Sequence, residues 1–367
     1  MKCDVAIVGA GISGPLSALK LAKKGYKVVV IEDREKVGTF TDTKIDITED
    51  RGIKKIIKEL DLPVILKTNK SKWFSPNYSF DLESEVYDIY FKRGPTEDSY
   101  EVNVTNSAED EGAKILTETN IQKFTLKQKE DKYKIVVSNS GGYQDIEAEF
   151  IIGADGFNSK VGKLGKVQYG KEKVRFVGYG VVGTKFDMPI ARTHLFFDRE
   201  LAPGGYMYIG KTDEGEGVAC IVVDSFLMKR DIKDYYQEFK RKNRTINKIL
   251  SESNIENTFR GMNATGDMPS RVKRNIVLVG DAARTLDPLF GYGVKNAIIS
   301  AYNASKAIMR AIDKEDRSEL SGYTEAIKNI NEEIILSYEM RKDLVKSSNK
   351  ELDELIKTER IVDFLVD

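Results

Sequence analysis

The chain contains 367 residues, of which 41% are hydrophobic, so it can bury a substantial core in one large domain with insertions or in two domains. Its 58 basic and 58 acidic residues cancel, which gives no support to a polyanionic partner and argues against nucleic-acid binding. Only two cysteines are present, Cys3 and Cys220, so we expect neither a disulfide nor a metal site, and a reducing cytoplasm. No apolar stretch approaches the length of a membrane span, and the short N-terminal apolar run does not resemble a signal peptide.

The first predicted element is an apolar run, Val5–Val8, which indicates a buried parallel strand that leads into a glycine-rich turn. Pro15–Lys24 follows with the apolar spacing of a helix, and Pro15 suits a first helical turn because its missing N–H is not needed there. A second strand is predicted over Lys27–Ile31. A strand, a glycine turn, a helix and a strand in this order predict a dinucleotide-binding unit, with the helix N-terminus facing the phosphates.

Each glycine of this turn has its own task in such a unit. Gly9 permits the tight turn, Gly11 lets the backbone approach a pyrophosphate, and Gly14 lets the helix pack closely on the strand. Glu32 ends the second strand, where a carboxylate binds a ribose 2′-OH, and this argues against NADP. The motif alone fits FAD and NAD equally. The residues expected to contact the dinucleotide here are Gly9, Gly11, Ile12, Ser13, Gly14, Glu32 and Asp33.

The middle of the chain predicts a short helix, a hairpin and a second glycine turn. A helix is expected to begin within Asn106–Gly112, ahead of a strand at Lys114–Leu116. Lys132–Ser138 alternates polar and apolar residues and is joined by a Gly-Gly turn to Tyr143–Phe150, which indicates a β-hairpin. That strand continues into the second glycine motif, GADG at 153–156. The carboxylate of this motif can bind a ribityl hydroxyl. Its expected cofactor-binding residues are Ala154, Asp155 and Gly156.

The segment after the second motif is rich in predicted strands, which together with Lys72–Tyr90 can form an antiparallel sheet. These strands are Val174–Lys185, Thr193–Phe197, Tyr206–Ile209 and Val218–Val223. Asp231–Ser251 then has the pattern of one amphipathic helix.

A third motif, GDAA at 280–283, follows another buried strand, Ile276–Val279. It precedes a long apolar helix from Val294 to about Ile312. A glycine-flanked helix start can approach a flavin ring and its pyrophosphate. The expected cofactor-binding residues here are Gly280, Asp281, Pro288, Gly291, Gly293 and Val294.

Beyond Gly322 the chain is predicted to be helical and highly charged, with the apolar cluster Ile361–Val366 at its end. The favoured interpretation is that these helices dock on their own domain, and a surface that faces lipid or a partner is the alternative. Because the three motifs are far apart, the nucleotide domain is expected to be discontinuous. We assign residues 1–70, 100–162 and 265–310 to this FAD-binding domain, 71–99 and 163–264 to an antiparallel-sheet substrate domain, and 311–367 to a C-terminal helical segment.

Three stretches of the sequence carry a family resemblance. GADGFNSKV resembles the DG motif of flavoprotein hydroxylases and their relatives, and VLVGDAARTLDPLFGYGVKNAI resembles their GD motif. The segment Ala202–Lys211, APGGYMYIGK, looks like the APGGY-x-W segment of the geranylgeranyl reductase family, which is similar to FixC. The resemblance covers roughly residues 1–310. It departs where the family usually has Trp for Tyr208 and Phe-Pro for Ile209-Gly210, and where many archaeal members carry a cysteine within Lys36–Thr48.

The resemblance implies an α/β fold: an FAD-binding, Rossmann-like, three-layer domain with an inserted antiparallel-sheet substrate domain and C-terminal helices. In this superfamily the inserted sheet covers the flavin and builds the substrate pocket. The flavin supplies the redox chemistry, so no Ser-His-Asp set is expected. Tyr206 and Tyr208 share one face of a strand, and with Tyr292 they are the candidate catalytic residues, although ordinary sheet packing explains the first two equally well. The lone His194 is expected to be structural.

Three functions stay open from the sequence. The first is an FAD-dependent oxidoreductase that reduces C=C bonds of a polyprenyl, geranylgeranyl lipid, with ferredoxin, a deazaflavin or NAD(P)H as electron donor. The second is an FAD-dependent aromatic monooxygenase, and the third is a FixC-like electron-transfer flavoprotein with a protein partner. For the reductase we expect a hydrophobic small-molecule or lipid substrate, with peripheral membrane contact of a cytoplasmic protein as an open alternative.

Overall fold

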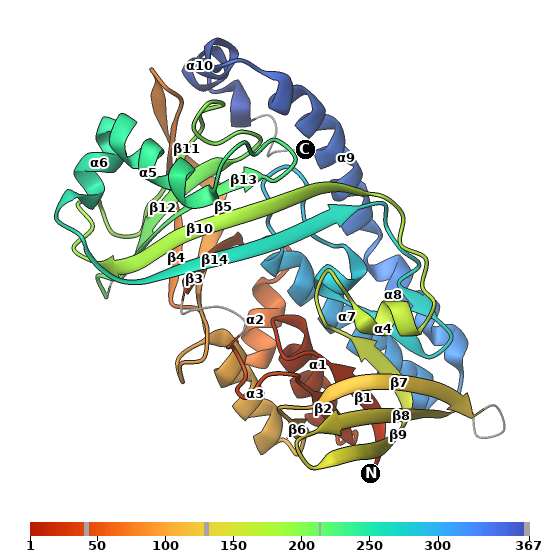
Figure 1. Cartoon of the computed structure of the whole chain (residues 1–367). Coiled ribbons are helices and arrows are strands. Elements are labelled where there is room, and N and C mark those ends of the chain that lie inside the picture. Colours follow the sequence, from red (N-terminus) through yellow and green to blue (C-terminus); the bar gives the residue numbers. More distant parts are fainter. Residues whose placement is uncertain (40–43, 128–131, 213, 363–367) are drawn as a thin grey trace.

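The computed structural model describes residues 1–39, 44–127, 132–212 and 214–362, and it divides the molecule into two sheet-based bodies (Figure 1). The lower body in that view contains both glycine motifs of the first half of the chain, and the upper body contains the long strands β10 and β14. Within the described ranges each body is built on one eight-stranded sheet. The mixed α/β architecture predicted from the sequence is therefore confirmed.

The first sheet is parallel at its centre, in the order β15-β16-β9-β1-β2-β6, and β8 and β7 extend it from β9 as antiparallel strands. In the β1–β2 pair, Val5 lies opposite Val28 and Val8 opposite Ile31. β2 and the part of β1 from Val5 onward are apolar on both faces, since helices cover one face and the β7–β8 hairpin and neighbouring loops cover the other. The bounds of the strands in this sheet are β1 Lys2–Val8, β2 Val28–Ile31, β6 Lys114–Leu116, β7 Asn120–Lys127, β8 Lys132–Asn139, β9 Gly142–Gly153, β15 Val272–Lys273 and β16 Ile276–Leu278.

Three helices pack on this sheet. They are α1 (Ser13–Ala22), α3 (Tyr100–Asp110) and α7 (Val294–Asp313), and each buries an apolar face in one shared core. Helix α3 starts earlier than the Asn106–Gly112 region predicted, because Ser99 caps it: its hydroxyl accepts a hydrogen bond from the Val102 N–H at 3.3 Å. The short helices α2 (Lys54–Leu60), α4 (Lys160–Leu164) and η1 (Gly280–Ala283) complete this body.

The second sheet has the order β14-β10-β13-β12-β11-β4-β5-β3, and its pairs are antiparallel except for β11 with β4. The edge strand β14 escaped prediction because most of its side chains are exposed and give no apolar alternation. The bounds are β3 Lys44–Glu49, β4 Leu66–Phe74, β5 Ser79–Arg93, β10 Glu172–Thr184, β11 Thr193–Phe196, β12 Tyr206–Lys211, β13 Gly217–Asp224 and β14 Asn254–Gly266.

Strand pairing differs from the predicted domain division in one place. Strands β3 and β4 were assigned wholly or partly to the nucleotide domain, as part of residues 1–70, yet both pair with β5 in the second sheet. The sequence does not show this pairing, because the strands that bond are separated along the chain. β5 is long enough to pair with β4 along one side and with β3 along the other. The chain therefore enters the second sheet at Lys44, contributes α2 to the first body between β3 and β4, and returns to the first body at α3.

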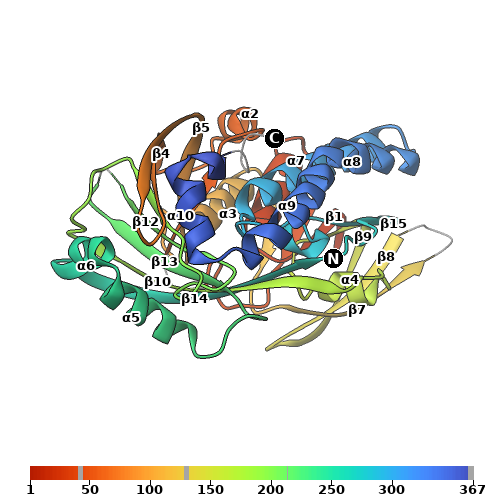
Figure 2. The same cartoon turned by 90° about the horizontal axis from the view of Figure 1, so that it is seen from above.

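Helices α5 (Ile232–Lys242) and α6 (Arg244–Ser251) cover the outer face of the second sheet, on the side opposite α10 (Figure 2). The single helix predicted over Asp231–Ser251 is wrong at one point. Asn243 adopts an extended conformation and its side chain accepts a hydrogen bond from the Ile246 N–H at 3.0 Å, so it ends α5 and caps α6.

The C-terminal helices pack against both bodies, as the favoured interpretation expected. They are α8 (Ser321–Ala326), α9 (Lys328–Lys346) and α10 (Asn349–Lys357), with the short η2 (Arg317–Leu320) and η3 (Arg360–Val362). Leu352 and Ile356 of α10 join a core with Trp73 and Phe290. Ile361 is buried in the same core, and the rest of the apolar cluster that ends at Val366 lies mostly outside the described residues. In the part of the chain described, no helix combines the length and apolarity needed to cross a bilayer.

An ion pair buried between α9 and β13 should contribute strongly to stability. Arg341 Nη2 lies 2.6 Å from Asp224 Oδ2, and both side chains are less than a tenth exposed. Asp224→Ala would leave the guanidinium buried without its partner, so we expect the free energy of unfolding in urea to fall by about 3–5 kcal/mol. Lys342→Ala on the same helix breaks a pair that is more than half exposed, and should change that free energy by less than about 1 kcal/mol. Equal effects of the two variants would contradict this assignment.

Candidate functional site

A cavity of about 680 Å³ lies where the two bodies meet, and all three glycine motifs reach its wall. The first sheet contributes the last residues of β1 and β2 and the residues that directly follow β9 and β16, and the second contributes one face of β10 to β13. Ligands of open parallel sheets bind beyond the carboxyl ends of the strands, which is where this cavity is found. Its volume falls in the range usual for cofactor and substrate sites.

The glycines of the first motif have two roles: two of them allow close contact between backbones, and one leaves open space in the cavity. A Cβ at Gly14 would lie 1.9 Å from the Gly9 carbonyl oxygen, and a Cβ at Gly9 would lie 2.5 Å from the Ala154 carbonyl oxygen. Gly9 also has φ +101, a conformation that favours glycine. Gly11 lines the cavity, and a Cβ there would meet nothing within 4 Å. The open space beside Gly11 leaves room for the approach of a pyrophosphate.

Glu32 holds the glycine turn in addition to facing the cavity. Its Oε2 accepts a hydrogen bond from the Ala10 N–H at 2.7 Å, and its Oε1 accepts one from the Arg34 N–H at 3.1 Å. Burial raises the pKa of Glu32, and the two backbone donors oppose that rise. Each carboxylate oxygen keeps a lone pair, so Glu32 can still accept a bond from a ribose hydroxyl. Asp33 lines the same end of the cavity.

The second motif places Ala154, Asp155 and Gly156 on the cavity wall. The Asp155 carboxylate accepts hydrogen bonds from the Ser159 hydroxyl at 2.6 Å and the Val161 N–H at 3.0 Å. Its first task is therefore to fix the turn before α4. Gly156 has φ +77 and open space where a Cβ would be, so the backbone here can also approach a ligand.

The third motif supplies a second carboxylate. Asp281 lines the cavity beside Asn263, whose amide nitrogen can reach its Oδ2 at 3.2 Å. Burial raises the pKa of Asp281 to about 6, and the positive charges of Arg93 and Lys44 oppose the rise. A buried carboxylate in such a place suits a hydroxyl donor from a ribityl chain.

The remaining predicted residues of that motif divide between wall and support. Gly291, Gly293 and Val294 line the cavity at the start of α7. Gly280 and Pro288 are not among the lining residues, and neither is Gly14. Gly280 has φ +56, and a Cβ there would lie 2.5 Å from the Ser13 hydroxyl oxygen, so it serves close packing against the first motif.

Asp287 organises the loop that carries Gly291 and Tyr292. Its Oδ1 accepts hydrogen bonds from the Leu289 N–H at 3.0 Å and the Phe290 N–H at 2.7 Å, which is the geometry of a turn-starting aspartate. The Tyr206 hydroxyl donates to the Phe290 carbonyl oxygen at 2.8 Å from the opposite sheet. Tyr206 therefore joins the second sheet to the loop at the start of α7.

Tyr206, Tyr208 and Tyr292 come together on the cavity wall. The first two rings lie 6.3 Å apart on β12, and Tyr292 stacks on Phe290 with ring centroids 5.7 Å apart. We call the cavity-facing side of the second sheet, which carries Thr193, Leu195, Tyr206, Tyr208, Cys220 and Val222, its inner face. Burial raises the pKa of all three phenols well above the ordinary value, so each is a poor acid.

Sequence reasoning missed a charged cluster on this wall. Lys44, Asp46 and Arg93 line the cavity, and Arg93 also contacts the buried Glu101. Burial alone would raise the pKa of Asp46, but Lys44 and Arg93 hold it below its usual value. No local motif marks these residues, because they meet only through the register of β3 on β5, in which Lys44 lies opposite Arg93. Together they offer cationic and anionic groups to a polar part of a ligand.

Other aromatic and ionisable candidates lie away from the cavity. His194 points to the outer side of the sheet between Phe74 and Phe196, where burial lowers its pKa to about 4. Its position agrees with a structural role. Trp73 and Phe80 belong to the core under α10, and Tyr78 is exposed, so none of the three lines the cavity. Within the described ranges, no group of three His, Cys, Asp or Glu side chains is arranged to hold a metal ion.

Comparisons with known proteins agree with this geometry. Residues 2–336 match the family described as an FAD binding domain. Digeranylgeranylglycerophospholipid reductase 3 of Methanosphaera stadtmanae is 26% identical over 96% of this chain and 89% of its own length. The digeranylgeranylglycerophospholipid reductase of Methanocaldococcus jannaschii is 25% identical, again over 96% of this chain and 89% of its own.

Solved structures share the fold. A geranylgeranyl bacteriochlorophyll reductase-like protein from Thermoplasma acidophilum superposes with a TM-score of 0.81 at 21% identity, over 97% of this chain and 91% of that one. PqsL, a probable FAD-dependent monooxygenase from Pseudomonas aeruginosa, gives 0.75 at 17% identity, over 94% and 97%. This chain belongs to the FAD-binding domain family, and it is an FAD-dependent oxidoreductase.

The two glycines that differ in their surroundings should fail in different ways. Gly11→Ala adds a methyl group only to the cavity, so we expect the melting temperature of the FAD-free protein to stay near wild type while FAD affinity falls about tenfold or more. Gly14→Ala drives a Cβ into the Gly9 carbonyl and should lower the melting temperature of the FAD-free protein itself. Calorimetry and FAD titration separate the two effects. An unstable Gly11 variant with normal FAD affinity would refute the assignment.

Proposed function

We propose that this enzyme reduces C=C bonds of a polyprenyl lipid of the geranylgeranyl type. The observation that carries the proposal is the continuity of one cavity from the three FAD motifs to the inner face of the second sheet. Archaeal relatives named digeranylgeranylglycerophospholipid reductases, which align with nearly the whole chain, support the choice of lipid.

The walls beyond the glycine motifs suit an apolar chain. Leu195, Val222, Phe176, Phe259 and Phe290 line the cavity. Apolar and aromatic surfaces gain free energy when they bury a hydrocarbon, at roughly 25 cal/mol for each Å² removed from water. An alkene offers no hydrogen-bonding group, so its recognition must depend on such surfaces and on shape.

The protein groups at the reacting end hold and orient. Bound FAD supplies hydride chemistry. The backbone at Gly11 would approach its phosphates, and the carboxylates of Glu32, Asp155 and Asp281 would accept hydrogen bonds from its hydroxyls. The loop from Asp287 to Gly293 is held by hydrogen bonds to the Asp287 carboxylate and by the Tyr206 hydroxyl, so its position against the inner face is fixed.

The three tyrosines line the site, and burial makes each of them a weaker acid than a free phenol. A phenol whose pKa is raised by burial gives up its proton less readily than a free phenol. The Tyr206 proton is also engaged by the Phe290 carbonyl oxygen. Tyr208 is half-buried on the cavity wall and offers its ring face to the lipid.

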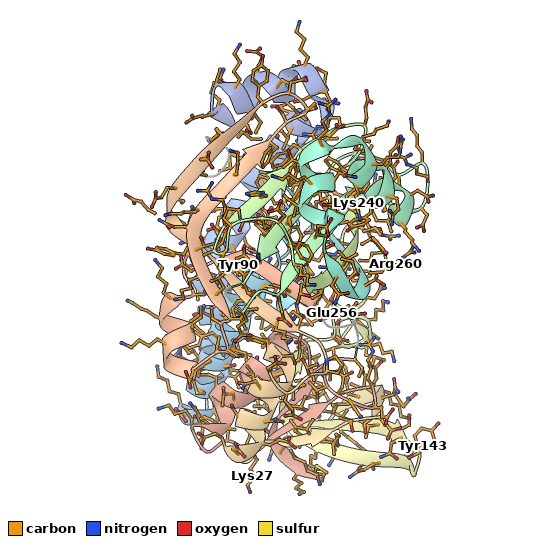
Figure 3. The ribbon with its side chains drawn as sticks, turned by 90° about the vertical axis from the view of Figure 1, so that its left-hand side faces the viewer. Lys27, Tyr90, Tyr143, Lys240, Glu256 and Arg260 are labelled. Carbon is orange, nitrogen blue, oxygen red and sulfur yellow. The ribbon has the colours of Figure 1, made fainter. Side chains whose placement is uncertain are left out.

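An anaerobic half-reaction tests the proposal. The FAD-loaded protein is reduced with dithionite, freed of excess reductant and mixed with a geranylgeranyl phospholipid in detergent. We expect the flavin absorbance of oxidised FAD to return, with a gain of two hydrogen atoms for each double bond reduced. Tyr208→Ala should raise the lipid concentration for half-maximal rate about tenfold, because it removes part of the apolar wall. Tyr143→Ala, at an exposed hairpin position far from the cavity, is the matched control (Figure 3).

The result that contradicts the proposal is equally direct. If reduced FAD stays reduced with the lipid until oxygen is admitted, the protein is not a polyprenyl reductase. Hydroxylation of an aromatic substrate on admission of oxygen would then establish the monooxygenase alternative. Reoxidation only by a co-purifying redox protein would establish an electron-transfer flavoprotein.

A further inference from the structure

A chain of three hydrogen-bonding side chains lies behind the inner face of the second sheet. Thr193 lines the cavity, and its hydroxyl donates to Asp88 Oδ2 at 2.8 Å. The Tyr90 hydroxyl lies 2.8 Å from the same Thr193 oxygen. Asp88 and Tyr90 are two residues apart on β5, on one face of that strand, and β11 brings Thr193 to them. Tyr90 is fully buried within the upper body (Figure 3).

The surroundings of Asp88 favour its protonated form. It is largely buried, and its nearest charged neighbours are Glu49 of β3 and Asp50, both acidic. Across the sheet it lies opposite Glu49 on one side and Thr68 on the other. Burial and these two carboxylates raise the pKa of Asp88 to about 6, although the bond from Thr193 opposes the rise. Its remaining solvent exposure allows protons to be replaced from water.

The number of hydrogens shared by Asp88, Thr193 and Tyr90 determines which group donates in each of their hydrogen bonds. A threonine hydroxyl has one hydrogen and can accept two bonds. While Asp88 is ionised, Thr193 gives its hydrogen to the carboxylate, so Tyr90 must donate to Thr193. Once Asp88 is protonated, its O–H can donate to Thr193 in turn. The Thr193 oxygen then accepts from both neighbours, and its own hydrogen is free for an acceptor in the cavity.

The position of the Tyr90 ring depends on Gly210, a glycine of another strand of the same sheet. A Cβ at Gly210 would lie 2.7 Å from the Tyr90 hydroxyl oxygen, so any larger residue would displace the ring. Gly210 is one of the positions at which the sequence departs from the APGGY-x-W segment. The departure thus creates the room in which Tyr90 reaches Thr193.

We propose that Thr193 is the group that delivers a proton to the substrate in the cavity, and that Asp88 supplies it through the hydrogen bond between them. The proposal rests on the proposed alkene reduction. One alkene carbon receives hydride, with both electrons, from reduced FAD. The other carbon receives the Thr193 hydrogen as a proton as its new C–H bond forms. The Thr193 oxygen takes the Asp88 proton, and the carboxylate regains a proton from water.

This assignment resolves a need that the tyrosines leave unmet. Protonation of the second alkene carbon requires an acid whose pKa is near the working pH. Tyr206, Tyr208 and Tyr292 have pKa values raised far above that range. Thr193 touches the cavity with a hydroxyl that is hydrogen-bonded to the carboxyl group of Asp88. The pKa of that carboxyl group is close to the working pH.

The matched variants are Thr193→Val, Thr193→Ser and Thr48→Val. Valine keeps the shape of threonine and removes the hydroxyl, and serine restores the hydroxyl. Thr48 is a buried threonine of the same sheet whose hydroxyl has no partner, so Thr48→Val controls for loss of a buried hydroxyl alone. In the anaerobic half-reaction at pH 6, we expect Thr193→Val to slow flavin reoxidation by roughly 10² or more. Thr193→Ser should recover most of the rate, and Thr48→Val should match wild type.

The pH profile distinguishes a relay from a structural contact. Asp88 is protonated below its pKa of about 6, so the wild-type rate should be highest there and fall about tenfold per pH unit above it when proton transfer limits the rate. Thr193→Val should lose this dependence. Independently of turnover, infrared difference spectra of the FAD-free protein should show carboxyl absorbance that titrates near pH 6, to which both Asp88 and Asp281 contribute. Asp88→Asn should remove the Asp88 part of this absorbance and leave the Asp281 part.

The outcomes separate this inference from the proposed function. If wild type does not reduce the lipid, the proposed function and the relay both fail. If wild type reduces it and Thr193→Val does so at the same rate with the same pH profile, only the relay fails. Carboxyl absorbance near pH 6 that Asp88→Asn leaves unchanged would also refute the supply of protons from Asp88.

Discussion

Three backbone hydrogen bonds hold the site together, and the rest of the structure depends on them. The Gly9 N–H donates to the Ile31 carbonyl oxygen at 2.8 Å, the Ala154 N–H donates to the Val8 carbonyl oxygen at 2.8 Å, and the Val279 N–H donates to the Gly153 carbonyl oxygen at 3.0 Å. Each bond links the end of one strand to its neighbour. They bring three motifs, far apart in the sequence, to one edge of one sheet, and glycine is required where those backbones meet.

The second sheet covers the cavity at this edge, and its two faces differ chemically. Its outer face packs on α5 and α6 and is a core of ordinary apolar residues. Its inner face combines apolar walls with Tyr206, Tyr208 and Cys220, whose pKa values burial raises, and Asp88, whose pKa is also raised, lies directly behind it. Perturbed titration at a cavity is typical of functional sites, and here it coincides with the surface opposite the glycine motifs.

Much of the fold and the cofactor end of the site could be predicted from the sequence, because those features are local. Apolar runs, glycines at fixed spacing and a following acid specify the strands, turns and helix starts within a few residues of each other. The cluster of Lys44, Asp46 and Arg93 could not be predicted, because it exists only through the register of β3 on β5. The same holds for Asp88 and Thr193, which are 105 residues apart. The edge strand β14 escaped for another reason: its exposed side chains carry no apolar alternation.

The central claim is that one cavity seats FAD and an alkene so that each can react with the other. The most direct test is the ratio of double bonds reduced to FAD reoxidised when the dithionite-reduced protein meets a geranylgeranyl phospholipid without oxygen. The account predicts a ratio of one, with no oxidised FAD formed when the lipid is fully saturated. Oxidised FAD that forms equally with the saturated lipid, or an unsaturated lipid recovered unchanged beside reduced FAD, would contradict it.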